Sequence, residues 1–179
     1  MSVLLRQAGH QIRALLPMLS SLALVLAGLL PIGLPHFGSV SPALALMSVF
    51  YWSIFRSDLM TMAGAFLIGL ILDLLSGGPP GLNALTLLLT HELGVSQRRV
   101  FLGSSFLVNW CCYALVATAA AAVSWALVCL LHWHLFPVVP VLAQWGLSLA
   151  TYPMIYWLLS LLERRYLRPE FTGFAAGAR

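Results

Sequence analysis

Six apolar segments limit the fold of this chain more than any other feature. They cover roughly residues 14–34, 40–55, 59–75, 81–96, 104–131 and 138–162, and glycine, proline or arginine separates them. A helix needs about 20 mostly apolar residues to cross a bilayer. Since 61% of the residues are hydrophobic and 8% are charged, against about 25% charged in soluble domains, we expect an all-α polytopic membrane protein with six transmembrane helices.

These segments leave room for loops and tails only. We therefore expect one six-helix transmembrane domain over residues 1–168 and a short cytoplasmic tail over residues 169–179. The first apolar segment exceeds the apolar part of a secretory signal, which spans about 7 to 15 residues. It is expected to be an uncleaved first helix.

The positive charges predict the orientation of the chain. All nine basic residues are arginines, and in a six-span arrangement every one falls on the same side of the membrane: Arg6, Arg13, Arg56, Arg98, Arg99, Arg164, Arg165, Arg168 and Arg179. Basic loops stay in the cytoplasm. Both termini are therefore expected there, and this arrangement explains the excess of positive charge without a nucleic-acid partner.

One acidic residue, Asp73, lies within the third apolar segment. A carboxylate at this depth costs about 2.5 to 3.5 kcal/mol on insertion scales, so it normally faces protein. Residues four apart share a helix face, which places Ala65, Gly69 and Asp73 in one row. Small residues at this spacing allow another helix to pack closely. We expect the row to face a neighbouring helix.

A glycine- and proline-rich turn follows Asp73 and leads to Asn83 in the fourth segment. Gly77 and Gly81 give the backbone freedom to reverse, and so short a turn makes the two helices antiparallel neighbours. Asn83, Thr86 and Thr90 share a face that could meet the row of Asp73. Three interpretations stay open: Asp73 and Asn83 only stabilise the hairpin, the hairpin also receives a partner helix or ligand, or Asp73 relays protons.

No catalytic, cofactor-binding or metal-binding group is predicted. The sequence from His91 to Val95 begins like the zinc protease motif His-Glu-x-x-His but has valine at the second histidine, which removes a ligand. Paired-carboxylate chemistry needs two acids close together, whereas Asp58 and Asp73 lie at opposite ends of one segment. We expect a protein that is not an enzyme.

Several other residues have predicted structural roles. Tyr51 and Trp52 fit an aromatic belt at the membrane surface, next to Arg56 and Asp58 at the cytoplasmic interface. The small residues from Ala117 to Ala122 predict close helix packing. Pro153 lies inside the last apolar segment, where it should kink the helix against its neighbours.

These residues resemble the MreD family of rod shape-determining membrane proteins. The resemblance follows the order of nearly all the segments, and its specific part is the stretch from Gly69 to Leu85. It is carried by Tyr51-Trp52 with Arg56 and Asp58, Gly64 to Asp73, Ser76-Gly77, Gly81 to Leu85, and Tyr152-Pro153 before a basic end. The chain departs from the family pattern at Ser57, often proline, and at Pro80, usually apolar.

The resemblance implies a non-enzymatic scaffold of the bacterial inner membrane that acts in peptidoglycan elongation and cell-shape control. It implies binding to MreC and a larger complex with MreB, RodA and a class B penicillin-binding protein. The family is also similar in architecture to the six-helix substrate-binding component of energy-coupling-factor transporters. A small-molecule-binding transporter component is therefore the alternative function.

Overall fold

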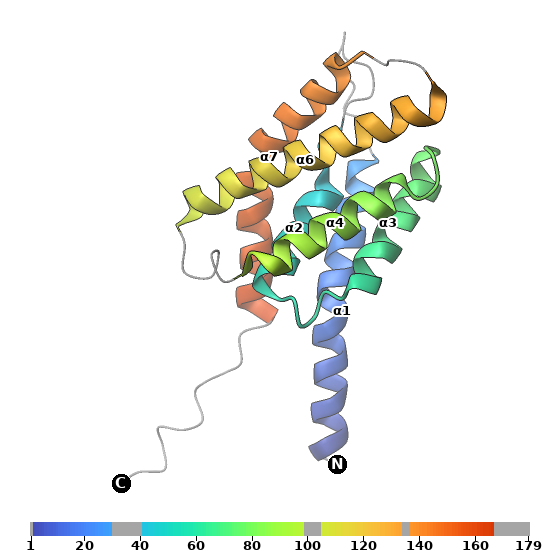
Figure 1. Cartoon of the computed structure of the whole chain (residues 1–179). Helices are drawn as coiled ribbons and strands as arrows, with labels where there is room; N and C mark the ends of the chain where they lie inside the picture. The colour runs from blue at the N-terminus through green and yellow to red at the C-terminus, as the bar shows by residue number, and fades with distance from the viewer. Residues whose placement is uncertain (1, 30–40, 99–104, 134–136, 167–179) are drawn as a thin grey trace.

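The computed structural model describes residues 2–29, 41–98, 105–133 and 137–166, and these contain only helices (Figure 1). Six helices lie within these described ranges: α1 (Ser2–Gly28), α2 (Leu44–Phe55), α3 (Met62–Ser76), α4 (Leu82–Ser96), α6 (Phe106–His132) and α7 (Val139–Tyr166). The predicted all-helical fold is confirmed for the described residues. The predicted tail over residues 169–179 lies outside them.

Helix α1 begins well before the position that the sequence predicted. The apolar segment starts near residue 14, yet the helix already begins at Ser2. The prediction was wrong at this point because it used hydrophobicity, whereas helix formation requires only continuous backbone hydrogen bonds. The ends of the other five helices lie within about four residues of the expected positions, as is usual for such boundaries.

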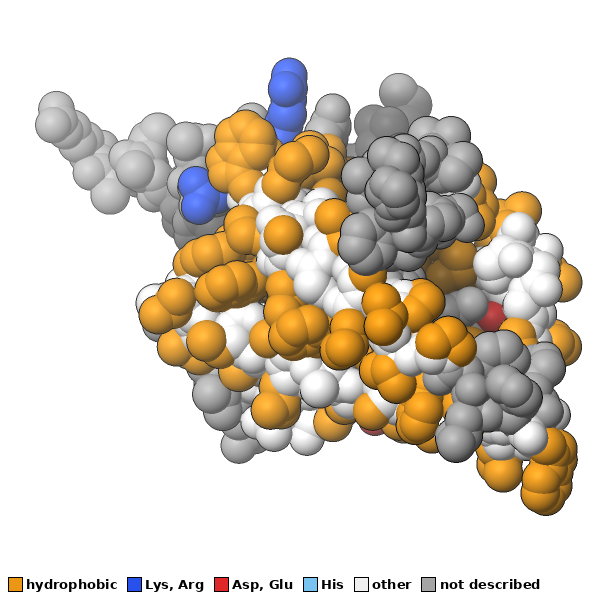
Figure 2. Space-filling model, turned by 90° about the horizontal axis from the view of Figure 1, so that it is seen from above, with side chains coloured by type: hydrophobic (Ala, Val, Ile, Leu, Met, Phe, Trp, Pro, Cys, Tyr) orange, Lys and Arg blue, Asp and Glu red, His pale blue; other side chains and the backbone are white. Residues whose placement is uncertain are grey.

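Two helices are long and apolar enough to cross a membrane by length and composition, over Phe106–Leu131 in α6 and Val139–Arg165 in α7. They are not the core helices of a soluble protein, because only 11% and 22% of their most apolar stretches are buried. Hydrophobic side chains also cover much of the described surface in Figure 2. So much exposed apolar surface suits a lipid environment and would be a liability in water. The two apolar helices and this exposed surface fit a membrane protein.

Helix α2 forms the centre of the bundle. Ten consecutive residues, from Ala45 to Ile54, are buried, and α2 packs against α1, α4 and α7. Tyr51 and Trp52 are therefore core residues, with exposed fractions of 2% and 0%. The predicted aromatic belt is wrong for this pair, because the neighbouring helices enclose α2 and both side chains face protein.

An aromatic cluster holds α2, α6 and α7 together on this core. The rings of Tyr113 and Tyr152 stack with their centroids 4.1 Å apart, and Phe50 packs against both. Aromatic pairs of this kind add about 0.5 to 1.5 kcal/mol beyond the burial of their surface. The cluster fixes how α6 and α7 sit on the central helix.

The ends of α2, α4 and α7 that carry arginines meet at one end of the bundle. Arg56, just after α2, pairs with Glu163 of α7, and Arg98 after α4 donates a hydrogen bond to Ser57 at 2.7 Å. Helix α1 begins and α7 ends towards this same end of the molecule (Figure 1). The turn between α3 and α4 lies at the opposite end of those two helices.

Candidate functional site: the hairpin of α3 and α4

Helix α3 begins and ends at residues suited to those positions. The side chain of Thr61 accepts a hydrogen bond from the backbone N–H of Gly64 at 3.1 Å, which satisfies one of the free donors of the first turn. Gly77 follows the helix with φ 65°, and Gly81 precedes α4 with φ 94°. Residues with side chains rarely adopt such values. These two glycines therefore make the reversal possible.

The carboxylate of Asp73 caps the start of α4. Its Oδ2 accepts from the backbone N–H groups of Gly81 and Ala84 at 2.9 and 3.1 Å. Its Oδ1 accepts from the backbone N–H and side-chain Nδ2 of Asn83 at 2.9 and 3.0 Å. Gly81 has no side chain with which to cap its own helix. An acid from the preceding helix performs that role.

This arrangement explains how a buried charge is tolerated. Asp73 has an exposed fraction of 2%, and an unpaired carboxylate at that burial would be costly. Four N–H donors satisfy it, and three of them are backbone groups at the positive end of the α4 dipole. The expected contact between Asp73 and Asn83 is present, and it is one part of a larger cap.

Gly69 allows the backbones of the two helices to touch. A Cβ atom on Gly69 would lie 2.4 Å from the Cα of Ala84 and 2.8 Å from the carbonyl oxygen of Asn83. Both distances are too short for any side chain to fit. Ala65, one turn earlier, is fully buried. The row of Ala65, Gly69 and Asp73 thus faces protein, as small residues at this spacing predicted.

The polar face of α4 is divided between two neighbours. Asn83 reaches Asp73, whereas the hydroxyls of Thr86 and Thr90 donate to backbone carbonyls of their own helix at 2.8 Å. Thr86 also shares a hydrogen bond of 3.2 Å with Ser124 of α6. The expectation that this whole face meets the row of Asp73 is therefore correct only for Asn83. Sequence reasoning did not find Ser124.

At the other end of the bundle, Glu163 joins two of the predicted interface residues. Its carboxylate accepts a hydrogen bond from the hydroxyl of Tyr51 at 2.8 Å and pairs with Arg56 at 3.3 Å. Trp52 donates to Ser20 of α1 at 3.0 Å, while Asp58 is exposed. Sequence reasoning grouped Asp58 with Arg56 and missed Glu163 as the partner.

Two further residues considered in the sequence analysis, His91 and Pro153, lie inside helices. His91 is buried, and its Nε2 lies 2.9 Å from the carbonyl oxygen of Met60. Within the described ranges, the side chains of His, Cys, Asp and Glu form no group of three that could hold a metal ion. Pro153 lies inside α7, which continues on both sides of it.

The comparisons with known proteins assign the chain to a family. The family model described as rod shape-determining protein MreD matches residues 10–165, a range that includes the whole hairpin of α3 and α4. Neither the curated proteins nor the solved structures gave a match. The chain belongs to the MreD family of rod shape-determining proteins.

Proposed function

We propose that this protein is a non-enzymatic scaffold of the rod complex in the bacterial inner membrane. It crosses the membrane six times, binds the single-span protein MreC, and helps to couple MreB in the cytoplasm to RodA and its class B penicillin-binding partner. Membership of a family of rod shape-determining proteins supports a role in cell shape.

The lengths of the helices are compatible with six crossings. Helices α2, α3 and α4 have 12, 15 and 15 residues, or about 18 to 22 Å at 1.5 Å per residue. That is shorter than the bilayer core of about 30 Å. Non-helical backbone at membrane depth is tolerated where protein covers it, and α2 is enclosed by its neighbours. The longer helices α6 and α7 carry most of the contact with lipid.

The position of the arginines supports cytoplasmic termini. Arg56 and Arg98 are held at one end of the bundle by Glu163 and Ser57, and Arg164 and Arg165 lie in the last turn of α7. This is the end that the positive-inside rule assigns to the cytoplasm. The turn with Gly77 and Gly81 then faces the outside of the cell.

The binding role is supported by the difference between the two faces of α3. One face packs against α4 within the hairpin, through Gly69 and Asp73. The other face exposes large apolar side chains: Phe66 44%, Leu67 49%, Ile71 36%, Leu74 74% and Leu75 50%. Because the buried cap fixes α3 against α4, this exposed face has a defined shape. We assign it to the transmembrane helix of MreC, which packs by van der Waals contact within lipid.

In this account Asp73 does not touch the partner. The four hydrogen bonds of its carboxylate go to residues of the turn and of α4. Its contribution to partner binding is to hold the hairpin in shape. Proton transfer is not required, since the carboxylate already has a structural purpose.

Two leucines with matched exposure test the assignment. Leu74 on α3 and Leu115 on α6 have exposed fractions of 74% and 75%, so replacing either by alanine disturbs the fold little. We expect Leu74→Ala to reduce the MreC that co-purifies with the protein by about three- to tenfold, typical of a truncated anchor in an interface. Leu115→Ala should leave it unchanged. Equal recovery of MreC with both variants would refute the assigned face.

A further inference from the structure

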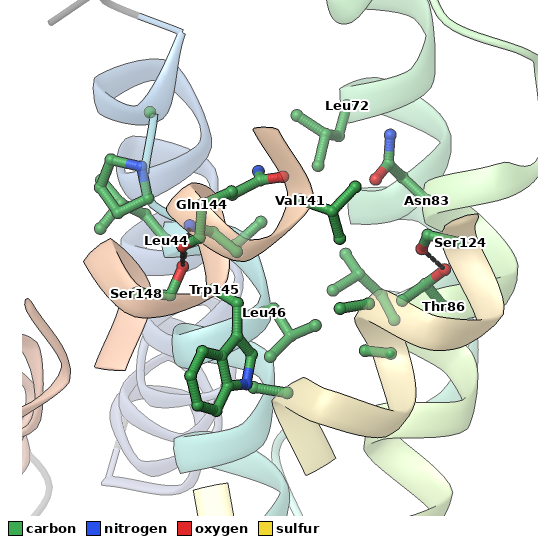
Figure 3. Close-up of a pocket in the computed structure, with 18 of the residues that line it drawn as sticks. Leu44, Leu46, Leu72, Asn83, Thr86, Ser124, Val141, Gln144, Trp145 and Ser148 are labelled. Carbon is green, nitrogen blue, oxygen red and sulfur yellow. Dashed lines mark hydrogen bonds between the residues drawn. The ribbon is translucent and has the colours of Figure 1, made fainter. Parts of the chain in front are cut away.

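A cavity of about 440 Å³ lies on the other side of the hairpin, between α4, α6 and α7 and the neighbouring ends of α1 and α2 (Figure 3). Its size falls within the range of small-molecule sites, about 300 to 1,000 Å³. Asn83 lines it, so the residue that helps to bind Asp73 also forms a wall of this space. The scaffold role proposed above does not use the cavity.

The walls of the cavity carry no charge. Among the described residues that line it there is no Asp, Glu, Lys, Arg or His. Leucine, valine and alanine side chains, such as those of Leu46, Leu87 and Ala117, form most of the surface. An ionised ligand would lose its water without gaining an opposite charge. An uncharged molecule with a large apolar part fits these walls.

Polar groups nevertheless point into the space from several helices. Figure 3 shows the amides of Asn83 and Gln144 extending into it from α4 and α7, with the hydrogen-bonded pair of Thr86 and Ser124 near Asn83. Tyr113 of α6 and Ser148 of α7 also line the cavity, and their side chains interact with each other. These uncharged amide and hydroxyl groups favour a ligand with hydroxyl or ester groups.

A second cavity of about 370 Å³ adjoins the first. The two share four lining residues on α6 and α7: Ala121, Trp125, Val141 and Trp145. The second cavity is also lined by Val138 and Leu142, which are exposed by 44% and 59%. It therefore leads from the first cavity to the apolar surface of α6 and α7. A molecule dissolved in the bilayer could enter this way without crossing water.

We propose that the larger cavity binds one uncharged lipid of the acylglycerol class from the bilayer. Its acyl chain lies against the apolar walls and extends between α6 and α7. Its hydroxyl and ester groups bond to the amides of Asn83 and Gln144. Such a ligand would fill the space between α4, α6 and α7, and would join the hairpin to the last two helices.

The test uses the full chain in lipid nanodiscs and a monoacylglycerol with a photoreactive diazirine in its acyl chain. Mass spectrometry then locates the labelled residues. We expect labelling to concentrate on cavity residues of α4, α6 and α7 and to fall when unlabelled monoacylglycerol is added. Labelling spread over the exposed faces of α6 and α7, with no effect of competitor, would overturn the proposal.

Two alanines of α6 provide a matched pair of variants. Ala121 lines both cavities, whereas Ala126 is exposed and lines neither. Ala121→Phe should lower the competed labelling by about tenfold, because the ring occupies the volume of several methylene groups. Ala126→Phe adds the same ring facing outwards and should leave labelling unchanged. An equal effect of the two variants would contradict the proposal, and competition on the unaltered protein decides it if Ala121→Phe fails to fold.

The head-group contact has its own test. Gln144→Leu keeps the size of the side chain and removes its amide, so labelling by the monoacylglycerol should fall about fivefold, as expected for one lost hydrogen bond. A photoreactive hydrocarbon without a head group should label this variant and the unaltered protein equally. An anionic phosphatidylglycerol probe should label the cavity weakly. Labelling by the anionic probe as strong as by the neutral one would refute the uncharged ligand.

Discussion

Gly69 of α3 lies directly on the backbone of Ala84 in α4: a Cβ atom added to Gly69 would be 2.4 Å from the Cα of Ala84 and 2.7 Å from its nitrogen. The backbone of Ala84 cannot rotate away as a side chain could, and its N–H is already bound to Asp73. The close approach and the cap therefore depend on each other. Moving α4 outward to make room at residue 69 would lengthen the hydrogen bonds of Asp73.

This contact makes Gly69→Ala a sharp test of the hairpin. We expect the substitution to destabilise the protein by about 1 to 3 kcal/mol, the usual cost of overpacking. Thermal unfolding in detergent, followed by circular dichroism, measures the change. Gly146 in α7 is the control, because a Cβ there meets no atom within 4 Å. If Gly69→Ala and Gly146→Ala have the same midpoint of unfolding, the close approach is not tight.

Gly81 should resist substitution for a different reason. Its φ of 94° is strained for any residue with a side chain, so Gly81→Ala should cost about 1 to 2 kcal/mol. No atom lies within 4 Å of a Cβ at this position, which means that backbone strain alone is tested. Gly78→Ala, in the same turn but without a positive φ, should unfold at nearly the same temperature as the unaltered protein. A larger loss at Gly78 would contradict the turn geometry.

Asp73→Asn should weaken the cap more than its small change in shape suggests. The amide that replaces one carboxylate oxygen can donate but not accept, so at least one buried N–H of Gly81, Asn83 or Ala84 loses its partner. We expect a loss of about 2 to 4 kcal/mol, since hydrogen bonds to buried charges are strong. Hydrogen exchange should quicken at the amides of residues 81, 83 and 84.

The control for this prediction is Asp58→Asn, which changes an exposed acid and should alter stability by less than about 0.5 kcal/mol. If Asp73→Asn leaves the exchange of the α4 amides unchanged, the carboxylate does not cap this helix. The comparison separates the cap from a general effect of lost negative charge.

The ion pair between Glu163 and Arg56 should make a small contribution to the stability of the protein. Glu163→Gln can still accept from Tyr51 but loses the charge that faces Arg56, and both side chains of that ion pair are partly exposed, at 29% for Arg56 and 23% for Glu163. A double-mutant cycle with Arg56→Gln should give a coupling of about 0.3 to 1 kcal/mol in unfolding free energy. A coupling of zero would mean that the ion pair adds nothing to stability.

The orientation of the bundle can be tested by labelling single cysteines in intact cells, after the three natural cysteines are replaced. Ser76→Cys, at the exposed last residue of α3, should react with a thiol reagent that cannot cross the membrane. Ser57→Cys, between α2 and α3 beside Arg98, should react only after the membrane is opened. The reverse pattern would contradict cytoplasmic termini.

The hairpin was predictable because its determinants are local in the sequence. Glycines at a turn, small residues four apart and an acid near an amide all act over a few residues, so Gly69, Asp73 and Asn83 were found together. The capping role of Asp73 was less visible. Its signal was an acid eight residues before a glycine that begins a helix and has no side chain to cap it.

Features that depend on distant residues were not predictable from one sequence. Tyr51 and Glu163 are 112 positions apart, and no local pattern pairs them. Hydropathy also fails to separate a helix enclosed by protein from one that faces lipid, which is why Tyr51 and Trp52 were placed in a membrane belt although α2 is buried. The run from Ala117 to Ala122 predicted tight packing, yet Ala120 and Ala121 line the large cavity. The predicted likeness to transporter components stays a prediction.

The exposed face of α3, which we assign to MreC, can be tested most directly by crosslinking. A photoreactive amino acid placed at position 74, and in a separate strain at position 115, tests it in living cells without disturbing the buried cap. Irradiation should give a crosslink to the transmembrane helix of MreC from position 74 and none from position 115, although the two leucines are equally exposed, at 74% and 75%. Crosslinking to MreC from position 115 alone would contradict the account.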